Sequence, residues 1–276
     1  MPKITVSIVV YRPDLSMLGL TLSSLGSSIR HVAERYGLEA KLSVVDNSCD
    51  PSVLPGIRSV IDAALAGIDV ELVVSPSNCG YGAANNLVIL DAVSDLHLVA
   101  NPDIILNEDA LSRAWEYLDA HPEVVLLTPA VRGEDGVRHY LCKHHPSLLI
   151  MLLRGFAPVS VKRIFKGMLD RFEMRDSDYT KEIDQVGYPT GCFMLFRTGQ
   201  LQAIRGFDED FFMYLEDADI GRRIGRLGAV RYVPSVKIVH QWARGSHTNW
   251  RLRWVTIQSV FIYWSKWGGT FRPSGR

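Results

Sequence analysis

Short apolar runs and longer amphipathic segments alternate through the first 120 residues, and this alternation limits the possible folds more than any other feature of the sequence. The runs are apolar at nearly every position and rich in β-branched residues; they cover residues 6–11, 42–45, 70–74 and 96–100. Strands that are apolar on both faces are typical of a parallel sheet with helices on both sides. The sequence therefore predicts an α/β fold with a mostly parallel, Rossmann-like central sheet flanked by helices.

The segments between these runs have the periodicity of helices. From Asp14, which is suited to be an N-cap, apolar residues recur every three or four positions until Gly37. Further helices are predicted over residues 82–92, 108–120 and 217–227, and later strands over residues 192–196 and 230–239. The sequence Gly-Glu-Asp-Gly at the centre of residues 131–140 predicts a hairpin.

The domain organisation follows from the absence of repeats and of linker-like composition. We predict one domain over residues 1–248 and an amphipathic helical extension over residues 249–276. The segment 148–172 is apolar and basic, and its pattern assigns no single element to it.

The composition excludes several classes of function. Thirty basic residues balance thirty acidic ones, so the chain as a whole has no electrostatic tendency to bind nucleic acid. The four cysteines are widely spaced and lack zinc-finger partners, which is typical of free thiols in a reducing cytosol. The N-terminal apolar run fits a buried strand better than a signal peptide, and no run reaches the roughly 18 apolar residues of a membrane span. We expect a cytoplasmic protein, which can also lie at the inner face of the cell membrane.

Polar residues follow each of the first four apolar runs. In open α/β sheets, ligands bind beyond the carboxyl ends of the strands, where the connecting loops converge. The chain carries these polar or small residues there: Tyr11, Asp46, Asn78, Gly80, Asn85, Asn101 and Asp103. A carboxylate such as Asp103 can hold a hard divalent cation that neutralises a leaving diphosphate. The alternative is that Asp46 and Asp103 are turn residues that bond to their own backbone.

The stretch 80–85 (Gly-Tyr-Gly-Ala-Ala-Asn) nearly matches the dinucleotide-binding fingerprint. A dehydrogenase carries that fingerprint after its first strand, where this chain has Tyr-Arg-Pro-Asp at residues 11–14. A sugar-nucleotide pyrophosphorylase requires a glycine-rich, basic loop at the same place, which is also absent. The helix that begins after Gly80 can still receive an anionic diphosphate at its N-terminus.

Acidic residues alternate with aromatic ones over residues 206–219, which is unusual for a core because buried carboxylates are costly without partners. If a helix begins at Asp217, this carboxylate either caps the helix or acts as a general base that takes a proton from an acceptor hydroxyl. Asp219 and Arg222 are spaced for a structural ion pair.

Two further candidates lie at and after the last predicted strand. His240 ends that strand, either as a structural histidine or as a contact to a metal or a diphosphate. Arg244 follows four residues later and has the side chain best suited to clamp a diphosphate.

Seven motifs occur in one order between residues 6 and 246. They are Val-Ser-Ile-Val-Val-Tyr, Val-Val-Asp-Asn-Ser, Asn-x-Gly-Tyr-Gly-x-x-Asn-Asn, Asn-Pro-Asp, Gly-Cys-Phe-Met-Leu-Phe-Arg, Gly-Phe-Asp-Glu-x-Phe-Phe-Met-Tyr-x-Glu-Asp-x-Asp, and the later histidine. No one of them is specific, but together they resemble the GT-A fold glycosyltransferases of family 2, in particular a rhamnosyltransferase-like branch.

This resemblance implies an inverting, single-displacement transfer from a nucleotide-diphospho-sugar that depends on Mg²⁺ or Mn²⁺. It implies that Asp217 is the catalytic base, with Glu216 as its neighbour, and that Asp103 and His240 lie at the metal. Asn101 stands where many relatives carry another aspartate. The residues expected at the nucleotide-sugar are Tyr11, Asp46, Asn78, Gly80, Asn85, Asn101 and Arg244. The branch favours dTDP-L-rhamnose as donor, with UDP-sugars as the alternative.

The acceptor is not identified by any motif. From the branch we expect a saccharide, linked to a lipid, in the synthesis of a bacterial surface polysaccharide. Residues 148–172 and 250–267 alternate apolar and basic side chains, which is the pattern of helices that lie on a membrane. Packing on the domain or on a second subunit of a homodimer is the alternative. A non-catalytic nucleotide- or glycan-binding protein of the same fold also stays open.

Overall fold

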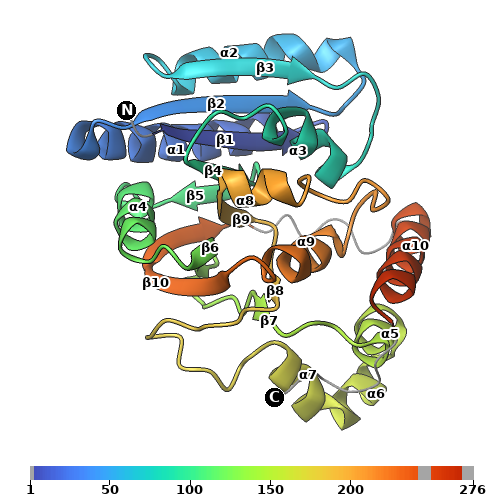
Figure 1. The fold of residues 1–276 in the computed structure, drawn as a ribbon. Helices are drawn as coiled ribbons and strands as arrows, with labels where there is room; N and C mark the ends of the chain where they lie inside the picture. The colour runs from blue at the N-terminus through green and yellow to red at the C-terminus, as the bar shows by residue number, and fades with distance from the viewer. Residues whose placement is uncertain (1–2, 242–249, 269–276) are drawn as a thin grey trace.

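The computed structural model describes residues 3–241 and 250–268. Their centre is a mixed eight-stranded sheet in the order β3-β2-β1-β4-β9-β6-β10-β5 (Figure 1). The first four strands in chain order are parallel to one another: β1 (Lys3–Val10), β2 (Glu39–Asp46), β3 (Asp69–Val74) and β4 (Leu96–Ala100). The predicted α/β fold with helices flanking a central sheet is thereby confirmed.

Beyond β4 the sheet is mixed. Strand β9 (Phe193–Arg197) runs antiparallel to both β4 and β6 (Val124–Arg132). Strand β10 (Ala229–His240) is parallel to β6, and the three-residue strand β5 (Ile104–Leu106) pairs antiparallel with its last residues. The sequence pattern predicts neither β5 nor β6, and β5 matters most for the site because it joins the exit of β4 to the end of β10.

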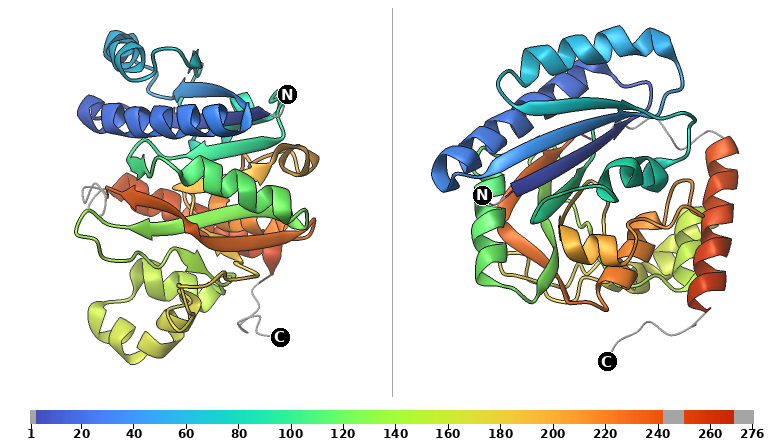
Figure 2. Two further views of the ribbon diagram at one scale, coloured as in Figure 1. Left: turned by 90° about the vertical axis from the view of Figure 1, so that its left-hand side faces the viewer. Right: turned by 45° about the horizontal axis from the view of Figure 1, so that its top comes forward.

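Alternate residues of β1 face the two sides of the sheet, as the two-residue period of a strand requires. Ile4, Val6 and Ile8 pack in the main core with α1 (Leu15–Tyr36), α2 (Leu54–Ala64) and α4 (Ala110–Ala120). Figure 2 shows α1 and α4 crossing this face. Val9 faces the other side, toward α3 (Tyr81–Ile89).

Local signals explain where the first helix begins and ends. The Asp14 side chain accepts hydrogen bonds from the backbone N–H groups of Ser16 and Met17, which have no partner inside the helix. At the other end Gly37 adopts a left-handed conformation with φ 64°, which costs glycine little. The predicted hairpin is also confirmed, since Arg132 and Arg138 bridge across a turn that contains Gly136 with φ 74°.

The segment 148–172 forms three short helices rather than one amphipathic helix. They are α5 (Leu148–Phe156), α6 (Val159–Ile164) and α7 (Lys166–Phe172). Pro158 separates the first two, because it lacks the N–H that a continuous helix needs. The C-terminal helix α10 (Trp250–Trp267) contacts α5, and the four helices lie at one end of the molecule (Figure 1).

The remaining elements surround the candidate site. A 3-10 turn, η1 (Pro51–Val53), precedes α2, and a second sheet consists of β7 (Cys142–Lys143) and β8 (Tyr188–Pro189). Helices α8 (Thr198–Ala203) and α9 (Glu216–Ile224) follow β9.

None of the helices within residues 3–241 and 250–268 has the length and hydropathy to span a membrane.

Candidate active site

Asp103 and His240 meet although 137 positions separate them in the chain. Asp103 directly precedes β5, and His240 is the last residue of β10, whose Cα pairs with that of Ile104. The Asp103 Oδ1 atom lies 3.2 Å from His240 Nε2. The N–H of Gln241 also donates to the Asp103 carbonyl at 2.9 Å, which fixes the two backbones together. The two residues predicted at the metal are therefore neighbours.

This pair fits a hard divalent cation in part. Asp103 Oδ1 is buried and accepts no hydrogen bond from the residues that the structure describes, so one carboxylate lone pair is available. The imidazole nitrogen beside it is a second donor atom. Within the described ranges no group of three or more His, Cys, Asp or Glu side chains surrounds a metal position. A cation held here needs further oxygen ligands, and diphosphate oxygens and water commonly supply them for Mg²⁺.

His139 lies next to this pair and was not among the predicted residues. Its ring is 6.4 Å from the ring of His240, in an edge-to-face arrangement. Burial lowers the pKa of His139, and the neighbouring His240 lowers it further. The hairpin over residues 132–138 brings His139 to this place, and nothing in a single sequence distinguishes it from the other histidines.

Asn101 is held by Tyr81 at the exit of β4. The Tyr81 hydroxyl lies 3.0 Å from both the Asn101 Oδ1 atom and the Gly191 carbonyl oxygen, so it can donate to either. Burial raises the pKa of Tyr81 well above its ordinary value, which keeps this hydroxyl protonated. The N–H of Asn101 also donates to the carbonyl of Cys192 at 3.0 Å. Asn101 is thereby linked to the residues beside Asp217.

The exits of β2 and β3 are joined by the side chain of Asn47. Its Nδ2 donates to Asn78 Oδ1 at 3.1 Å and to the Gly80 carbonyl at 3.2 Å, while its Oδ1 accepts from the N–H of Cys79. Asp46 lies beside it, buried, and accepts from the N–H of Ser48 at 3.0 Å. Two predicted residues, Asp46 and Asn78, are thus brought to adjacent loops. Tyr11, at the end of β1, is exposed.

Gly80 has a structural reason to be glycine. Its φ of 92° is one that other residues rarely adopt, and an added Cβ would lie 2.2 Å from the carbonyl oxygen of Phe212. That oxygen accepts a hydrogen bond from the N–H of Tyr81 at 3.0 Å. The close approach ties the loop after β3 to the acidic segment before α9.

Asn85 is enclosed within the protein. It is fully buried, its Oδ1 accepts from the Ser7 hydroxyl at 2.7 Å, and its Nδ2 donates to the Tyr81 carbonyl at 3.0 Å. Both polar atoms of the Asn85 side chain are therefore hydrogen-bonded to residues of β1 and α3. This geometry supports a packing role rather than the expected direct contact with a nucleotide-sugar.

Glu216 and Asp217 form the first turn of α9, which begins one residue earlier than predicted. The two residues before it, Tyr214 and Leu215, have φ values of 72° and 65°. Such consecutive left-handed conformations cost free energy in residues other than glycine and often occur at functional sites. Asp217 Oδ2 accepts from the N–H of Gly191 at 3.1 Å and its Oδ1 from the N–H of Ala218 at 3.0 Å.

The two adjacent carboxyl groups hold protons unusually well. Burial and, to a smaller extent, the neighbouring Asp217 carboxylate together raise the pKa of Glu216 to about 8. Glu216 Oε2 is buried and has no hydrogen-bond partner among the described residues, as suits a neutral acid better than a carboxylate. Burial also raises the pKa of Asp217, and the cation of Lys143 opposes that rise. The Asp217 side chain nevertheless keeps some exposure, so a ligand can reach it.

Lys143 was missed by the sequence interpretation. It lies in β7, pairs with Tyr188 of β8, and is only 7% exposed. Its Nζ donates to Thr190 Oγ1 at 3.2 Å and lies 4.3 Å from the centre of the Tyr188 ring. Burial lowers the pKa of Lys143, and Asp217 opposes that change. A two-residue strand has no periodicity to read, so the sequence held no signal for this buried cation.

Asp219 forms an ion pair, but with a different partner from the one predicted. Its Oδ2 accepts from Arg223 Nε at 2.6 Å, four residues along the helix, and not from Arg222. Arg222 instead lies over the ring of Trp267, 4.6 Å from its centre. Trp267 Nε1 donates to Asp219 Oδ1 at 2.9 Å, so the end of α10 is attached to α9. Arg244 lies outside the described residues.

Comparison with known proteins finds a matching family model and two similar proteins. The family model described as glycosyl transferase family 2 matches residues 21–199. An N-acetylglucosaminyl-diphospho-decaprenol L-rhamnosyltransferase of Mycobacterium tuberculosis is 29% identical over 190 residues, which are 64% of this chain and 61% of that protein. Rhamnosyltransferase WbbL of Escherichia coli is 27% identical over 184 residues, 63% of this chain and 64% of WbbL. The chain thus spans about three fifths of the length of these relatives.

Two solved structures share the fold. The mannosyltransferase PcManGT of Pyrobaculum calidifontis, in complex with GDP-Man and Mn²⁺, has a TM-score of 0.64 at 17% identity, with 97% of this chain and 65% of that chain covered. Residues 1–349 of S. aureus TarS, in complex with UDP-GlcNAc, have a TM-score of 0.58 at 18% identity, covering 92% and 66%. At such low identity these matches concern the fold, which is the GT-A glycosyltransferase fold.

Proposed function

The chain belongs to glycosyltransferase family 2, and from this premise we propose that it transfers L-rhamnose from dTDP-L-rhamnose to a hydroxyl of a lipid-linked saccharide. The choice of donor is supported by the two relatives, both of which are rhamnosyltransferases by name. The name of the mycobacterial relative describes a saccharide on a decaprenyl diphosphate, which supports the same class of acceptor here. The process we propose is the assembly of a bacterial surface polysaccharide.

The donor site in this proposal lies over the exits of β1 to β4. Asp46 and Asn78 lie on adjacent loops joined by Asn47, where carboxylate and amide oxygens can accept from a base or a ribose. Asn101 lies one exit further along, held in place by Tyr81. Tyr11 is exposed beside them and offers an aromatic face.

Asp103 and His240 would hold a divalent cation, Mg²⁺ or Mn²⁺. When bound, such a cation neutralises the negative charge that develops on a departing nucleoside diphosphate. The support for this assignment is the available Asp103 carboxylate oxygen beside the His240 nitrogen. The presence of Mn²⁺ in the PcManGT complex supports it as well.

Asp217 would act as the general base of an inverting, single-displacement reaction. The base takes the proton from the acceptor hydroxyl as that oxygen attacks the anomeric carbon, and the nucleoside diphosphate leaves from the opposite face. The backbone N–H groups of Gly191 and Ala218 orient the Asp217 carboxylate. Its pKa is raised by burial, so the carboxylate is a stronger base than an ordinary aspartate. Glu216, whose pKa is raised to about 8, would remain a neutral neighbour.

The location we propose is the inner face of the cell membrane. The helices α5, α6, α7 and α10 form one end of the molecule (Figure 1) and carry many of the exposed large apolar side chains. Phe156, Val159 and Ile164 are among them, next to exposed basic residues such as Lys166. Such a surface favours reversible binding to a lipid interface.

The test of the donor is isothermal titration of dTDP and of UDP, each with Mn²⁺ and then with EDTA. We expect metal-dependent binding of dTDP that is at least tenfold tighter than that of UDP. Transfer from dTDP-L-rhamnose to an N-acetylglucosaminyl diphosphate lipid is then measured directly. Tighter binding of UDP would reassign the donor class, and no transfer from either donor would contradict the proposed reaction.

A further inference from the structure

Helix α10 has apolar side chains on two sides. Only one of these sides packs on the rest of the described protein. Its inner side carries Ser259 and Tyr263, which are 1% and 2% exposed, and Tyr263 packs with Phe211 and Leu215. Its other side carries five large apolar side chains that alternate at spacings of four and three residues and are all exposed; we call this set the outer stripe, and its members are Trp250, Trp254, Ile257, Phe261 and Trp264. A continuous exposed apolar surface of this kind indicates a binding surface.

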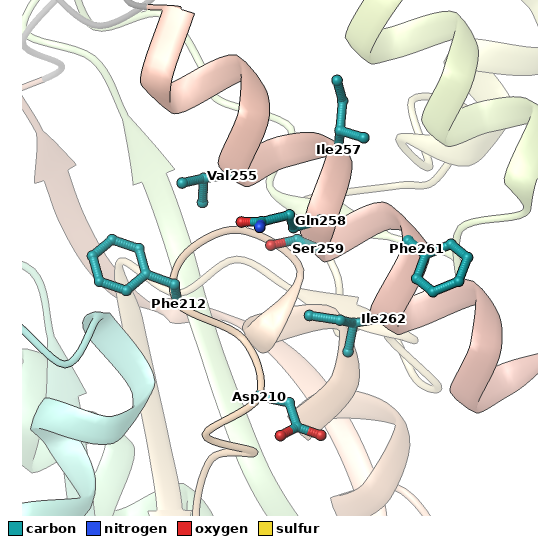
Figure 3. Close-up of a pocket in the computed structure, with 8 residues that line it drawn as sticks. All are labelled: Asp210, Phe212, Val255, Ile257, Gln258, Ser259, Phe261 and Ile262. Atoms are coloured by element: carbon teal, nitrogen blue, oxygen red, sulfur yellow. The ribbon is translucent and has the colours of Figure 1, made fainter.

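The outer stripe borders a groove between α10 and the loop that contains residues 210–212 (Figure 3). The groove has a volume of about 570 Å³, within the range of about 300–1,000 Å³ that is usual for pockets of small ligands. Its apolar lining consists of Phe212, Val255, Ile257, Phe261 and Ile262. Ile257 and Phe261 belong both to the groove and to the outer stripe, so the groove opens directly onto that stripe.

The loop wall of the groove leads along the chain to the candidate base. Its loop wall is held to α10 by the Ser259 hydroxyl, which donates to the Met213 carbonyl at 2.7 Å. The carbonyl of Phe212, on the same wall, accepts from the N–H of Tyr81 at 3.0 Å. Four residues after Phe212 the chain enters α9 at Glu216 and Asp217. One side of the groove is therefore continuous with the place where an acceptor hydroxyl would lose its proton.

Charge decides what kind of ligand fits. Among the described residues that line the groove, Asp210 is the only ionisable side chain and none is basic, so this lining suits a neutral chain rather than a diphosphate. Outside it, residues 148–172 and 250–267 carry eight basic and one acidic side chain, although the whole chain is neutral. Helix α10 carries Arg251, Arg253 and Lys266 and no acidic residue, so two copies packed through the outer stripe would form no ion pair between their α10 helices. A lipid with an anionic headgroup complements both the stripe and the basic residues.

We propose that this groove binds the isoprenoid chain of the lipid-linked acceptor, in the part of the chain nearest its diphosphate. This inference rests on the proposed function, because it assumes a lipid-linked acceptor. The chain enters from the outer stripe, lies between α10 and the loop, and presents the saccharide toward Asp217. Recognition of the lipid and recognition of the sugar are then joined by one loop.

The binding test uses farnesyl diphosphate and dimethylallyl diphosphate, titrated by calorimetry against protein saturated with dTDP and Mn²⁺. Because each buried methylene contributes about 0.8 kcal/mol, the ten additional carbons of the farnesyl chain should tighten binding at least tenfold. Phe261→Asp should abolish this difference. Val93→Asp is the matched control, since Val93 is an exposed apolar residue that belongs neither to the outer stripe nor to the groove. It should leave the difference intact.

The activity test compares one saccharide diphosphate that carries a farnesyl group with the same compound carrying a methyl group. We expect kcat/KM at least tenfold higher for the farnesyl acceptor, with the preference lost in Phe261→Asp and retained in Val93→Asp. Equal binding of the two diphosphates by the unaltered protein would overturn the inference. So would equal effects of the two substitutions, or a dimer in sedimentation that Phe261→Asp dissociates. Binding of farnesyl diphosphate without any transfer would instead contradict the proposed function and leave the groove assignment standing.

Discussion

The two carboxylate sites of this protein use the same kind of side chain in opposite surroundings. Asp103 is 25% exposed, and its Oδ1 atom lies 3.2 Å from His240 Nε2, a second atom that can bind a cation. Glu216 and Asp217 lie side by side; burial raises the pKa of both, and the charge of Asp217 contributes to the rise for Glu216. Carboxylates whose environments differ in this way perform different tasks. The first site is suited to hold a cation, and the second is suited to hold a proton.

The two sites are nevertheless connected by a short series of hydrogen bonds. Tyr81 lies within 3.0 Å of both Asn101, near Asp103, and the Gly191 carbonyl. The N–H of Gly191 in turn donates to Asp217. Substitutions can therefore test whether the sites act separately, as the difference in their surroundings suggests, or as one unit.

The largest effect is expected for Asp217→Asn. The amide cannot accept the proton of an acceptor hydroxyl, and a general base typically contributes about 10²–10⁴-fold to a rate. We expect kcat to fall by about that factor while the dissociation constant of dTDP, measured by calorimetry with Mn²⁺, stays within about twofold. A comparable loss of dTDP binding would assign Asp217 to the nucleotide site and remove the distinction between the two carboxylate sites.

Asp103→Asn should show the reverse pattern. The neutral amide is a weaker ligand for a hard cation than a carboxylate, so the gain in dTDP affinity on adding Mn²⁺ should fall at least tenfold. Binding of dTDP in EDTA should not change, which serves as the internal control for folding. If the gain from Mn²⁺ is intact, the cation is held elsewhere and the pair of Asp103 and His240 has a structural role.

Lys143→Met tests why Asp217 can ionise at all in its surroundings. The Lys143 cation opposes the rise in the pKa of Asp217, so its removal should raise that pKa further. Since the base must be deprotonated, the acidic limb of the pH profile of kcat should move to higher pH by the same amount. Activity should recover toward alkaline pH, which a merely structural defect would not produce.

Lys143→Arg is the matched variant, because it keeps the charge at nearly the same place. Its acidic limb should stay close to that of the unaltered enzyme. A limb that moves equally in the Met and Arg variants would mean that packing, and not charge, is the contribution of Lys143.

The same contrast explains which parts of the site could be predicted from the sequence. Asp46, Asn78 and Asn101 follow apolar runs, so the rule that ligands bind at strand ends finds them without any long-range information. The contact between Asp103 and His240 depends on the antiparallel pairing of β5 with β10. A strand of three residues has too little periodicity for this pairing to be predicted from the sequence. The motif order suggested a shared role for these two residues, but it could not supply their contact.

The second site was less accessible to sequence reasoning because its properties come from burial. Glu216 and Asp217 stand out as acidic residues, yet their raised pKa values depend on everything packed around them. Lys143 reaches them through a two-residue strand. The outer stripe of α10 was visible as a helical pattern, but which side of the helix packs on the domain could only be learned from the structure.

The smallest expected effect concerns stability and comes from Glu216→Gln. A buried carboxyl group whose pKa is raised from 4.5 to about 8 binds its proton more tightly in the folded protein than in the unfolded chain. It therefore contributes stability that is complete below pH 4.5 and is lost as the pH rises to about 8. Glutamine resembles the protonated acid and does not ionise, so the variant should escape this loss.

Thermal unfolding of the two proteins at pH 5 and pH 8.5 measures the difference. At pH 8.5 the variant should unfold at a temperature higher by about 2–4 °C, the shift that 1 kcal/mol produces in a chain of this size, and at pH 5 the two should nearly coincide. Asp103→Asn provides the comparison from the other site and should show no such gain at high pH. If Glu216→Gln is instead less stable at both pH values by the same amount, the Glu216 carboxylate is ionised and paired in the folded protein. The two carboxylate sites would then differ in their ligands but not in how they hold protons.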